Sequence, residues 1–268
     1  MTLLSPRPWL AESLARDRTL TLFGLLMWAA LLPAALAWGL DGRELRGLSV
    51  WLKPIKFMAS IGLFALTTAW FIGLLPPAAR ERRAARSVVW LIVGFGGAEI
   101  AYITLQAALG QASHYNFSSP MHIALYSAMG FGALAMTASQ PLLAWLILRH
   151  GRTDVAPAWR LAVLLGLVLT FVLGAGAGGL LGSMQPPAGA GLPLVGWHLG
   201  GGDLRPAHFL GLHAQQFLPL AGLAVVAWPA RRARWALVLF AVFYAAAWAW
   251  ALQRGLHGAV LTVPDAAG

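Results

Sequence analysis

One segment of the chain reads Gly202-Asp203-Leu204-Arg205-Pro206-Ala207-His208-Phe209-Leu210-Gly211-Leu212-His213-Ala214-Gln215-Gln216. It carries one Asp, one Arg, two His and two Gln, in a chain that otherwise consists mostly of Leu, Ala, Val and Gly. The segment leads directly into an apolar run that is too long for a soluble core. Polar groups at this density beside a membrane helix are costly unless they act together. The segment therefore predicts a membrane fold with a polar site inside it.

The composition of the whole chain supports a membrane fold. Of the 268 residues, 59% are hydrophobic and only 10% are charged, whereas a soluble domain carries roughly 25% charged residues. So few charges cannot cover a surface that faces water, and we predict an integral membrane protein. The net charge of +10 comes from short basic clusters between apolar runs, which indicates membrane topology and no nucleic-acid partner. The absence of cysteine excludes thiolate metal sites and thiol catalysis.

Seven apolar segments reach the length of about 20 residues that a helix needs to cross a bilayer. The sequence therefore predicts an all-α, polytopic bundle of seven transmembrane helices within residues 19–253. We expect residues 1–18 to form an amphipathic segment at the membrane surface and residues 254–268 to form a short outer tail. The first span is longer than the apolar part of an ordinary signal peptide, so we expect it to stay uncleaved. The predicted spans are 19–40, 51–75, 87–110, 121–148, 158–182, 207–229 and 235–253.

The basic residues predict how the bundle is oriented. Thirteen of the 19 Lys and Arg fall in one set of connections and six in the other. The positive-inside rule then places the N-terminus in the cytoplasm and the C-terminus outside, in a bacterial inner membrane. The fifth predicted helix carries Gly174, Gly178 and Gly182 at four-residue spacing. Such spacing lets two helix backbones approach closely, either inside the bundle or in a homo-oligomer.

This orientation gathers the polar residues in the outer half of the membrane. Glu99 lies deepest, near the middle of the third predicted helix, and Tyr102 and Gln106 follow on the same helix face. A carboxylate that faced lipid would cost at least a few kcal/mol, so Glu99 must point into the bundle. It is either a hydrogen-bonded structural residue or a proton carrier or ligand, and the rarity of intramembrane carboxylates favours a functional role.

Two other helices contribute polar groups to this half. His122 and Tyr126 share a face at the start of the fourth helix, where they are either interfacial anchors or ligand-binding residues. Lys53 and Lys56 lie on one stripe of the second helix together with Ser60. These lysines either extend to the lipid headgroups or attract an anion, or they balance Glu99 or Asp203.

The sixth predicted helix begins after Asp203, which can cap it, and Pro206 suits its first turn. His208 and His213 are five residues apart, so they cannot chelate one metal as an i, i+4 pair would. His213 and Gln216 share a face deeper in the membrane, whereas Arg205 belongs to the rim. His208 is either a rim residue that pairs with Asp203 or a further metal ligand. The Gly/Pro-rich connection 183–205 is too long and too apolar to stay free in water. It either covers the outer cavity as a lid or lies on the membrane surface.

Two motifs resemble those of a group of bacterial multi-span membrane proteins of unassigned function. They are Leu52-Lys53-Pro54-Ile55-Lys56-Phe57 and the stretch Gly202–His213 quoted above. This resemblance implies no activity. Microbial rhodopsins do not fit, because the last predicted helix has no Lys for a Schiff base. Ceramidase-like zinc hydrolases need an HxxxH pair, which His208 and His213 do not form. Cytochrome-b-like proteins use inward-facing His residues on separate helices, and His122 and His213 lie on separate predicted helices.

Three functions remain open. The preferred hypothesis is a membrane-embedded oxidoreductase or hydrolase that acts on a lipid-soluble substrate, with Glu99 and His213 as catalytic residues. His122, His208 and His213 would bind a divalent transition metal or haem b. The alternatives are a proton-coupled transporter of a small hydrophobic or anionic molecule, and a non-catalytic subunit or sensor. The predicted ligand-binding residues are Lys53, Lys56, Tyr102, Gln106, Tyr126, Asp203, Arg205 and Gln216.

Overall fold

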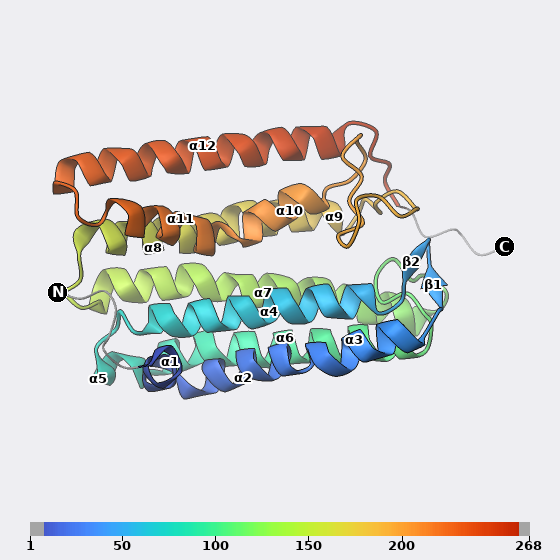
Figure 1. Ribbon diagram of the computed structural model, residues 1–268, viewed down its shortest axis with the longest axis horizontal. Helices are drawn as coiled ribbons and strands as arrows, with labels where there is room; N and C mark the ends of the chain where they lie inside the picture. The colour runs from blue at the N-terminus through green and yellow to red at the C-terminus, as the bar shows by residue number, and fades with distance from the viewer. Residues whose placement is uncertain (1–7, 263–268) are drawn as a thin grey trace.

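The computed structural model describes residues 8–262, and over that range it contains helices and one short β-hairpin (Figure 1). The all-α prediction is confirmed. Six helical stretches are long and apolar enough to cross a membrane, which supports an integral membrane protein with several spans. They are Arg18–Leu40, Leu52–Ile72, Arg83–Ala108, Pro120–His150, Pro157–Leu181 and Ala230–Leu256.

The first of these stretches consists of α2 (Arg18–Ala29) and α3 (Leu31–Leu40), which meet at Ala30. Pro33 accounts for the interruption, because it has no backbone N–H to donate to the carbonyl four residues earlier. A short helix, α1 (Trp9–Arg16), precedes them and runs across the axis of the other helices (Figure 1). It falls within the predicted surface segment 1–18, of which residues 1–7 lie outside the described residues. Its position at a membrane surface stays a prediction.

The helices α4 (Leu52–Ile72), α6 (Arg83–Ala108) and α7 (Pro120–His150) pack with α2 in one part of the bundle. A single turn, α5 (Pro77–Arg80), connects α4 to α6. The main apolar core lies where α4 and α7 end and where α6 begins. It includes Leu20, Phe64, Ile72, Ile92 and Leu143.

The fifth stretch contains a widened turn. It consists of α8 (Pro157–Leu169), the π-helical turn η1 (Thr170–Ala175) and α9 (Gly176–Leu181). Gly174 and Gly178 pack within the chain, since a Cβ on Gly174 would lie 3.2 Å from the backbone nitrogen of Leu212 and one on Gly178 would lie 2.9 Å from His208 Cε1. This is the first of the two alternatives for the glycine stripe. The homo-oligomer stays a prediction.

The prediction of one continuous helix over 207–229 is wrong in one respect. The structure has two helices here, α10 (Arg205–Leu212) and α11 (Ala214–Val225), and His213 lies at their junction. Each of the two is shorter than a membrane span. The break has two physical reasons: the N–H of Gln215 donates to Thr170 Oγ1 on the neighbouring η1 (2.9 Å), and Pro219 removes a further helix hydrogen bond. Irregular backbone at π-turns and broken helices is frequent at functional sites.

The last helix, α12 (Ala230–Leu256), lies along α8, α10 and α11 and is the least buried of the six long stretches. It extends three residues beyond the predicted boundary at 253. The hairpin of β1 (Glu44–Leu45) and β2 (Leu48–Ser49) was not predicted, and it pairs Glu44 with Ser49. We call this end of the bundle the hairpin end.

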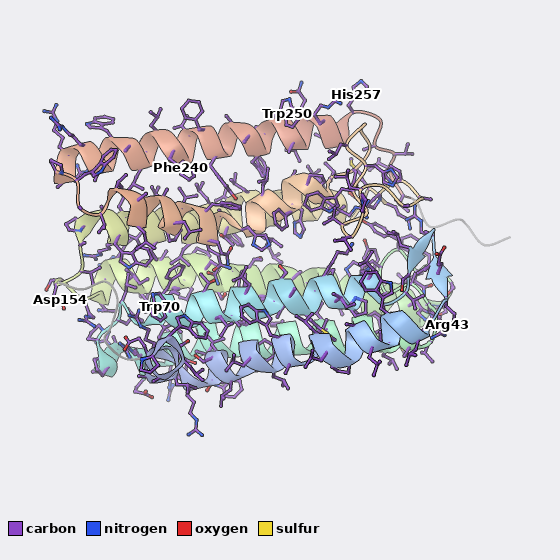
Figure 2. The ribbon with its side chains drawn as sticks, in the orientation of Figure 1. Arg43, Trp70, Asp154, Phe240, Trp250 and His257 are labelled. Atoms are coloured by element: carbon purple, nitrogen blue, oxygen red, sulfur yellow. The ribbon has the colours of Figure 1, made fainter. Side chains whose placement is uncertain are left out.

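The opposite end is the arginine end, where the described members of the larger basic set collect. Asp154 lies at the arginine end and Arg43 at the hairpin end (Figure 2). The main apolar core fills the half near the arginine end, and Glu99, Lys53 and most of the histidines lie in the other half.

Candidate functional site

The half of the bundle at the hairpin end contains a buried carboxylate. Glu99 is 8% exposed and lies nine residues before the end of α6 at Ala108, or about 14 Å at 1.5 Å per residue. Its charge interacts with that of Lys53 on α4. Among residues 8–262, no side chain or backbone group forms a hydrogen bond with Glu99. The carboxylate therefore points into the bundle, as the sequence predicts, and it has a cation as its counterpart.

Two neighbours of Glu99 on the same face of α6 also lack hydrogen bonds. The phenol oxygen of Tyr102 and the amide oxygen of Gln106 are both buried without a partner among the described residues. Leaving such a group unpaired costs about 1–3 kcal/mol. Three polar groups in one row without hydrogen bonds therefore lower the stability of the fold, which argues against a purely structural role. Water or a ligand could supply the missing partners.

A line of polar side chains continues from Lys53 toward the arginine end. Lys53, Ser60 and Thr67 recur every seven residues on one face of α4, over about 21 Å. Two residues lie across from them: His213 at the junction of α10 and α11, and Gln216 on α11. The contacts are Ser60 Oγ to His213 Nε2 (3.5 Å), His213 Nδ1 to Gln216 Oε1 (3.2 Å) and Gln216 Nε2 to Thr67 Oγ1 (3.1 Å). We call Lys53, Glu99, Ser60, His213, Gln216 and Thr67 the polar seam.

The polar seam stops short of the arginine end. Beyond it lies a small buried group in which Gln140 donates to Ser139 Oγ (2.9 Å) and, more weakly, to Thr68 Oγ1 (3.4 Å). The main apolar core then closes the bundle.

His208 has a structural role in this arrangement. Its Nδ1 donates to the carbonyl of Gly174 (3.0 Å), which lies in the π-turn. Gly178 leaves room for the ring, because a Cβ there would be 2.9 Å from His208 Cε1. The imidazole thus fixes α10 against the fifth stretch and satisfies a carbonyl of the widened turn.

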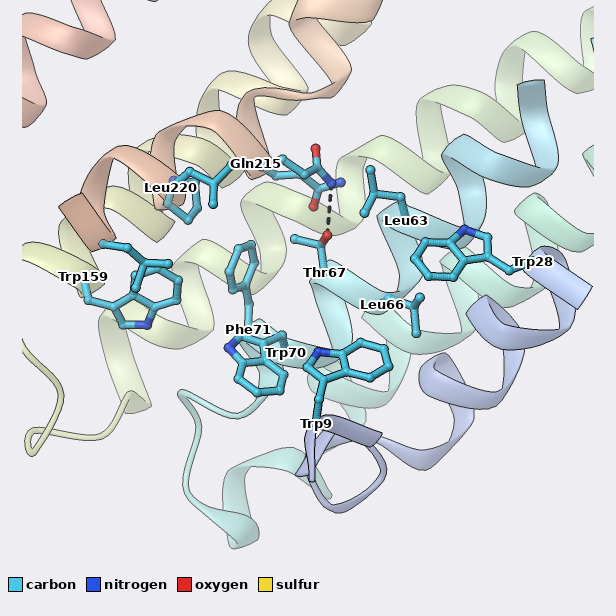
Figure 3. A pocket seen from close by; sticks show the side chains of 13 residues that line it. Trp9, Trp28, Leu63, Leu66, Thr67, Trp70, Phe71, Trp159, Gln215 and Leu220 are labelled. Atoms are coloured by element: carbon cyan, nitrogen blue, oxygen red, sulfur yellow. Dashed lines mark hydrogen bonds between the residues drawn. The ribbon is translucent and has the colours of Figure 1, made fainter. Parts of the chain in front are cut away.

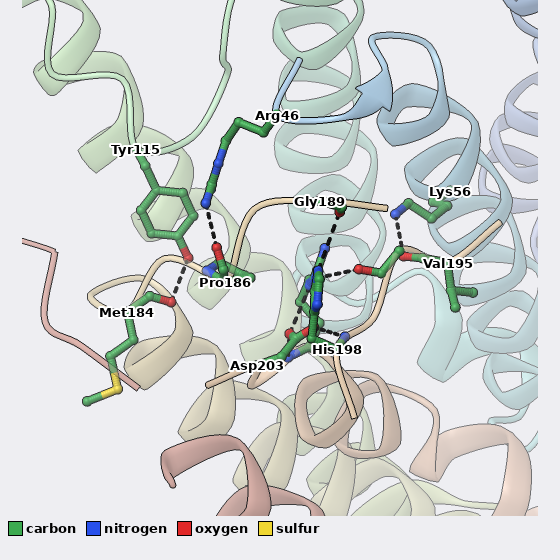
Figure 4. Close-up of polar contacts among 11 residues, drawn as sticks. Arg46, Lys56, Tyr115, Met184, Pro186, Gly189, Val195, His198 and Asp203 are labelled. Atoms are coloured by element: carbon green, nitrogen blue, oxygen red, sulfur yellow. Dashed lines mark hydrogen bonds and ion pairs between the residues drawn. The ribbon is translucent and has the colours of Figure 1, made fainter. Parts of the chain in front are cut away.

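The connection 182–204 folds back over the hairpin end, and we call it the cover loop. Its carbonyls are held by three cations: Lys56 donates to Val195 (2.9 Å), Arg205 to Gly196 (2.6 Å) and Arg46 to Pro186 (2.7 Å) (Figure 4). Lys56 and Arg205 were predicted as ligand-binding residues, and in this structure they bind the loop. An anion that reached them would compete with the loop carbonyls.

Asp203 anchors the end of the cover loop. It is 2% exposed, forms an ion pair with Arg205 (2.6 Å) and accepts the backbone N–H of His198 (2.8 Å). Burial alone would raise the pKa of Asp203, but the hydrogen bonds from the Arg205 side chain and from the N–H groups of His198 and Arg205 outweigh burial and lower it. The carboxylate therefore stays charged and keeps the loop attached. This agrees with the predicted capping role.

The fourth span contributes less to the seam than expected. His122 contacts Ser119 Oγ (2.8 Å) and Ser118 Oγ (3.3 Å), both at the cap of its own helix. Tyr126 donates to the carbonyl of Gly182 (2.7 Å), where the cover loop begins. These contacts tie His122 to the start of its own helix, and they give Tyr126 a part in holding the loop. The anchoring and ligand-binding alternatives for His122 both stay predictions.

Sequence reasoning missed His114 and Tyr115. The ring of His114 packs between Phe57 and Tyr126. Burial holds the pKa of His114 well below the usual histidine value, and Lys53 lowers it further. Tyr115 donates to the carbonyl of Leu181. The signal available in the sequence was a run of aromatic residues through Phe117, which indicates a packed loop.

No group of three His, Asp or Glu side chains that could hold a metal ion occurs within residues 8–262. His122, His208 and His213, the predicted metal ligands, are therefore not brought together as such a group. The fold and the site define a multi-helix membrane protein with a buried polar site. No family model, curated protein or solved structure matches the chain.

Proposed function

We propose that the protein is a proton-coupled carrier of a small molecule, in which Glu99 takes up and releases the proton. In this proposal the bundle crosses the membrane seven times, with α10 and α11 together as the sixth crossing and the N-terminus in the cytoplasm. The observation that carries the proposal is Glu99, which is 8% exposed and forms no hydrogen bond within residues 8–262, together with the buried oxygens of Tyr102 and Gln106, which have no partner there either. A carboxyl group that faces a cation can release or take up its proton as a charged ligand binds or leaves.

The polar seam and the cover loop support this function. The seam reaches about two-thirds of the way through a hydrocarbon core of about 30 Å. The cover loop lies over its hairpin end, and at its other end Thr67 and Gln216 line a lateral cavity. A cover over the hairpin end is what a carrier needs in a state that is closed toward that side. The broken helix at His213 provides a place where the backbone can change without unfolding a continuous helix.

The metal or haem enzyme has less support. Both ring nitrogens of His213 already have partners, Ser60 and Gln216, and Nδ1 of His208 is bonded to Gly174. No observation in the described residues favours that function over the carrier.

The test uses purified protein in liposomes that enclose a pH-sensitive dye, with a panel of small organic acids, amines and neutral metabolites added outside. We expect at least one solute to drive a proton flux that Glu99→Gln reduces to the level of empty liposomes. Glu44→Gln is the matched control, because Glu44 is an exposed carboxylate on the hairpin. Solute uptake that is equal in Glu99→Gln and in the wild type would overturn the proposal, as would a stoichiometric metal or haem in the purified protein.

A further inference from the structure

A second polar group without partners lies on the wall of a cavity that the polar seam reaches only through Thr67 and Gln216. The cavity has a volume of about 360 Å³ and lies between α4 and α11, toward the arginine end (Figure 3). Its volume is at the small end of the range for ligand sites, about 300–1,000 Å³. The residues that matter here are Trp9, Trp70, Trp159, Gln215 and Leu220.

The walls of the cavity are mostly apolar, and four of its residues are tryptophans. Trp9 comes from α1, Trp28 from α2, Trp70 from α4 and Trp159 from α8. The mouth is apolar and open to the side, because Leu220 on its rim is 59% exposed. In a bilayer this side faces the lipid chains. A ligand would therefore enter from the membrane, and flat apolar rings or chains would fit between the indoles.

Gln215 is the polar group that the cavity leaves unsatisfied. Its side chain is 0% exposed and lines the cavity, and both its amide nitrogen and its amide oxygen are buried without a hydrogen-bond partner among the described residues. The backbone of Gln215 is held by Thr170, so the side chain stays where it is. Each orphan atom costs about 1–3 kcal/mol, which is why such groups normally have partners.

A carboxamide has one face that both donates and accepts. A carboxylic acid in its neutral form matches that face with two hydrogen bonds: the acid O–H donates to the amide oxygen, and the amide N–H donates to the acid carbonyl. The neutral form is also the one that apolar surroundings favour. An ester or an ether could make only one of the two bonds.

We infer that this lateral cavity is a binding site for a lipid-soluble carboxylic acid, whose protonated acid group pairs with Gln215 while its apolar body lies against the tryptophans. The site is separate from Glu99 and does not depend on the proposed carrier function. It adds a ligand that enters from the membrane to a protein whose polar seam is covered at the hairpin end.

The probe is anthracene-9-carboxylic acid, which accepts energy from tryptophan emission, titrated at mildly acidic pH into the full-length protein in lipid nanodiscs. We expect a saturable energy-transfer signal above the partitioning that empty nanodiscs show. Gln215→Leu should weaken the saturable binding roughly tenfold, the value of about one hydrogen bond to an otherwise unsatisfied group. The methyl ester of the probe should bind wild type as weakly as the acid binds Gln215→Leu.

A second variant covers the case in which Gln215→Leu does not fold. Leu220→Trp narrows the mouth without changing the buried wall, and it should abolish saturable binding. Leu239→Trp, at a 57% exposed position of α12 that does not line the cavity, is the matched control and should bind as the wild type does. Purely linear partitioning in the wild type, or unchanged binding in Leu220→Trp, would overturn the site. Equal affinity for acid and ester would overturn the pairing with Gln215.

Discussion

At the residue scale, the site depends on side chains whose partners come from other helices. Glu99 and its position in the bundle could be predicted, because a carboxylate within an apolar run must face the interior. The partners of His208 and His122 could not be predicted. A Gly174 carbonyl freed by a π-turn and a serine cap give no distinct signal in the sequence, since glycine and serine occur in many other roles.

His114 gives a prediction for the dependence of stability on pH. Burial, with help from Lys53, lowers its pKa in the folded protein, whereas in the unfolded chain it titrates near about 6.5. Below that pH the unfolded chain takes up a proton that the folded protein does not, so folding stability falls as the pH falls. This contribution has a slope of up to about 1.4 kcal/mol per pH unit until the folded pKa is reached.

The measurement is the free energy of unfolding in detergent as a function of pH, for wild type and His114→Phe. The phenyl ring fits between the same aromatic neighbours and cannot titrate. Below about pH 6.5, we expect the free energy of unfolding to depend less steeply on pH in the variant, by an amount that corresponds to at most one proton. Parallel curves for the two proteins would show that His114 titrates freely when folded.

At the element scale, the broken sixth helix and the widened fifth stretch depend on each other. The apolar run after Pro206 has the composition of one regular helix, so the sequence predicts a continuous span over 207–229. The break becomes evident only when the neighbour is known: Gly211 packs against the backbone of Gly174, and Thr170 takes the N–H of Gln215. These are contacts between residues far apart in the sequence, and hydrophobic periodicity contains no information about them.

Gly211→Ala tests this contact. A Cβ at Gly211 would lie 2.5 Å from Gly174 N and 2.6 Å from its Cα, and backbone atoms of a packed helix cannot move aside easily. We expect a loss of about 1–3 kcal/mol or more, seen as a lower unfolding temperature. Gly176→Ala, on the same fifth stretch, is the control, since nothing lies within 4 Å of its added Cβ. It should be neutral or stabilise by about 0.5–1 kcal/mol. Equal effects of the two substitutions would contradict the close crossing.

At the scale of the whole molecule, composition and apolar run length predicted the class of fold, because bilayer thickness fixes how long an apolar helix must be. Six of the seven predicted spans correspond to long apolar helices. The uneven distribution of polar groups was also foreseen. The cover loop could be expected to fold back but not to be tied down by Lys56, Arg205 and Asp203, since those ties run between a loop and side chains of other elements.

The proposed topology can be tested directly because the chain has no cysteine. Gly42→Cys at the hairpin end and Ala78→Cys at the arginine end are both at exposed positions. We expect a membrane-impermeant maleimide, added to intact spheroplasts, to label Gly42→Cys, and to label Ala78→Cys only after the membrane is opened. The reverse pattern would mean that the polar seam opens toward the cytoplasm. Labelling of both variants from outside would contradict an odd number of crossings between the two ends.

The central claim is that Glu99 exchanges a proton inside the membrane, and infrared difference spectroscopy on the reconstituted protein tests it most directly. Spectra recorded between two pH values report the carbonyl band of a carboxylic acid as it gains or loses its proton. The account predicts such a band in the wild type and in the surface control Glu44→Gln, and its loss in Glu99→Gln. Identical difference spectra for the wild type and Glu99→Gln would contradict the claim.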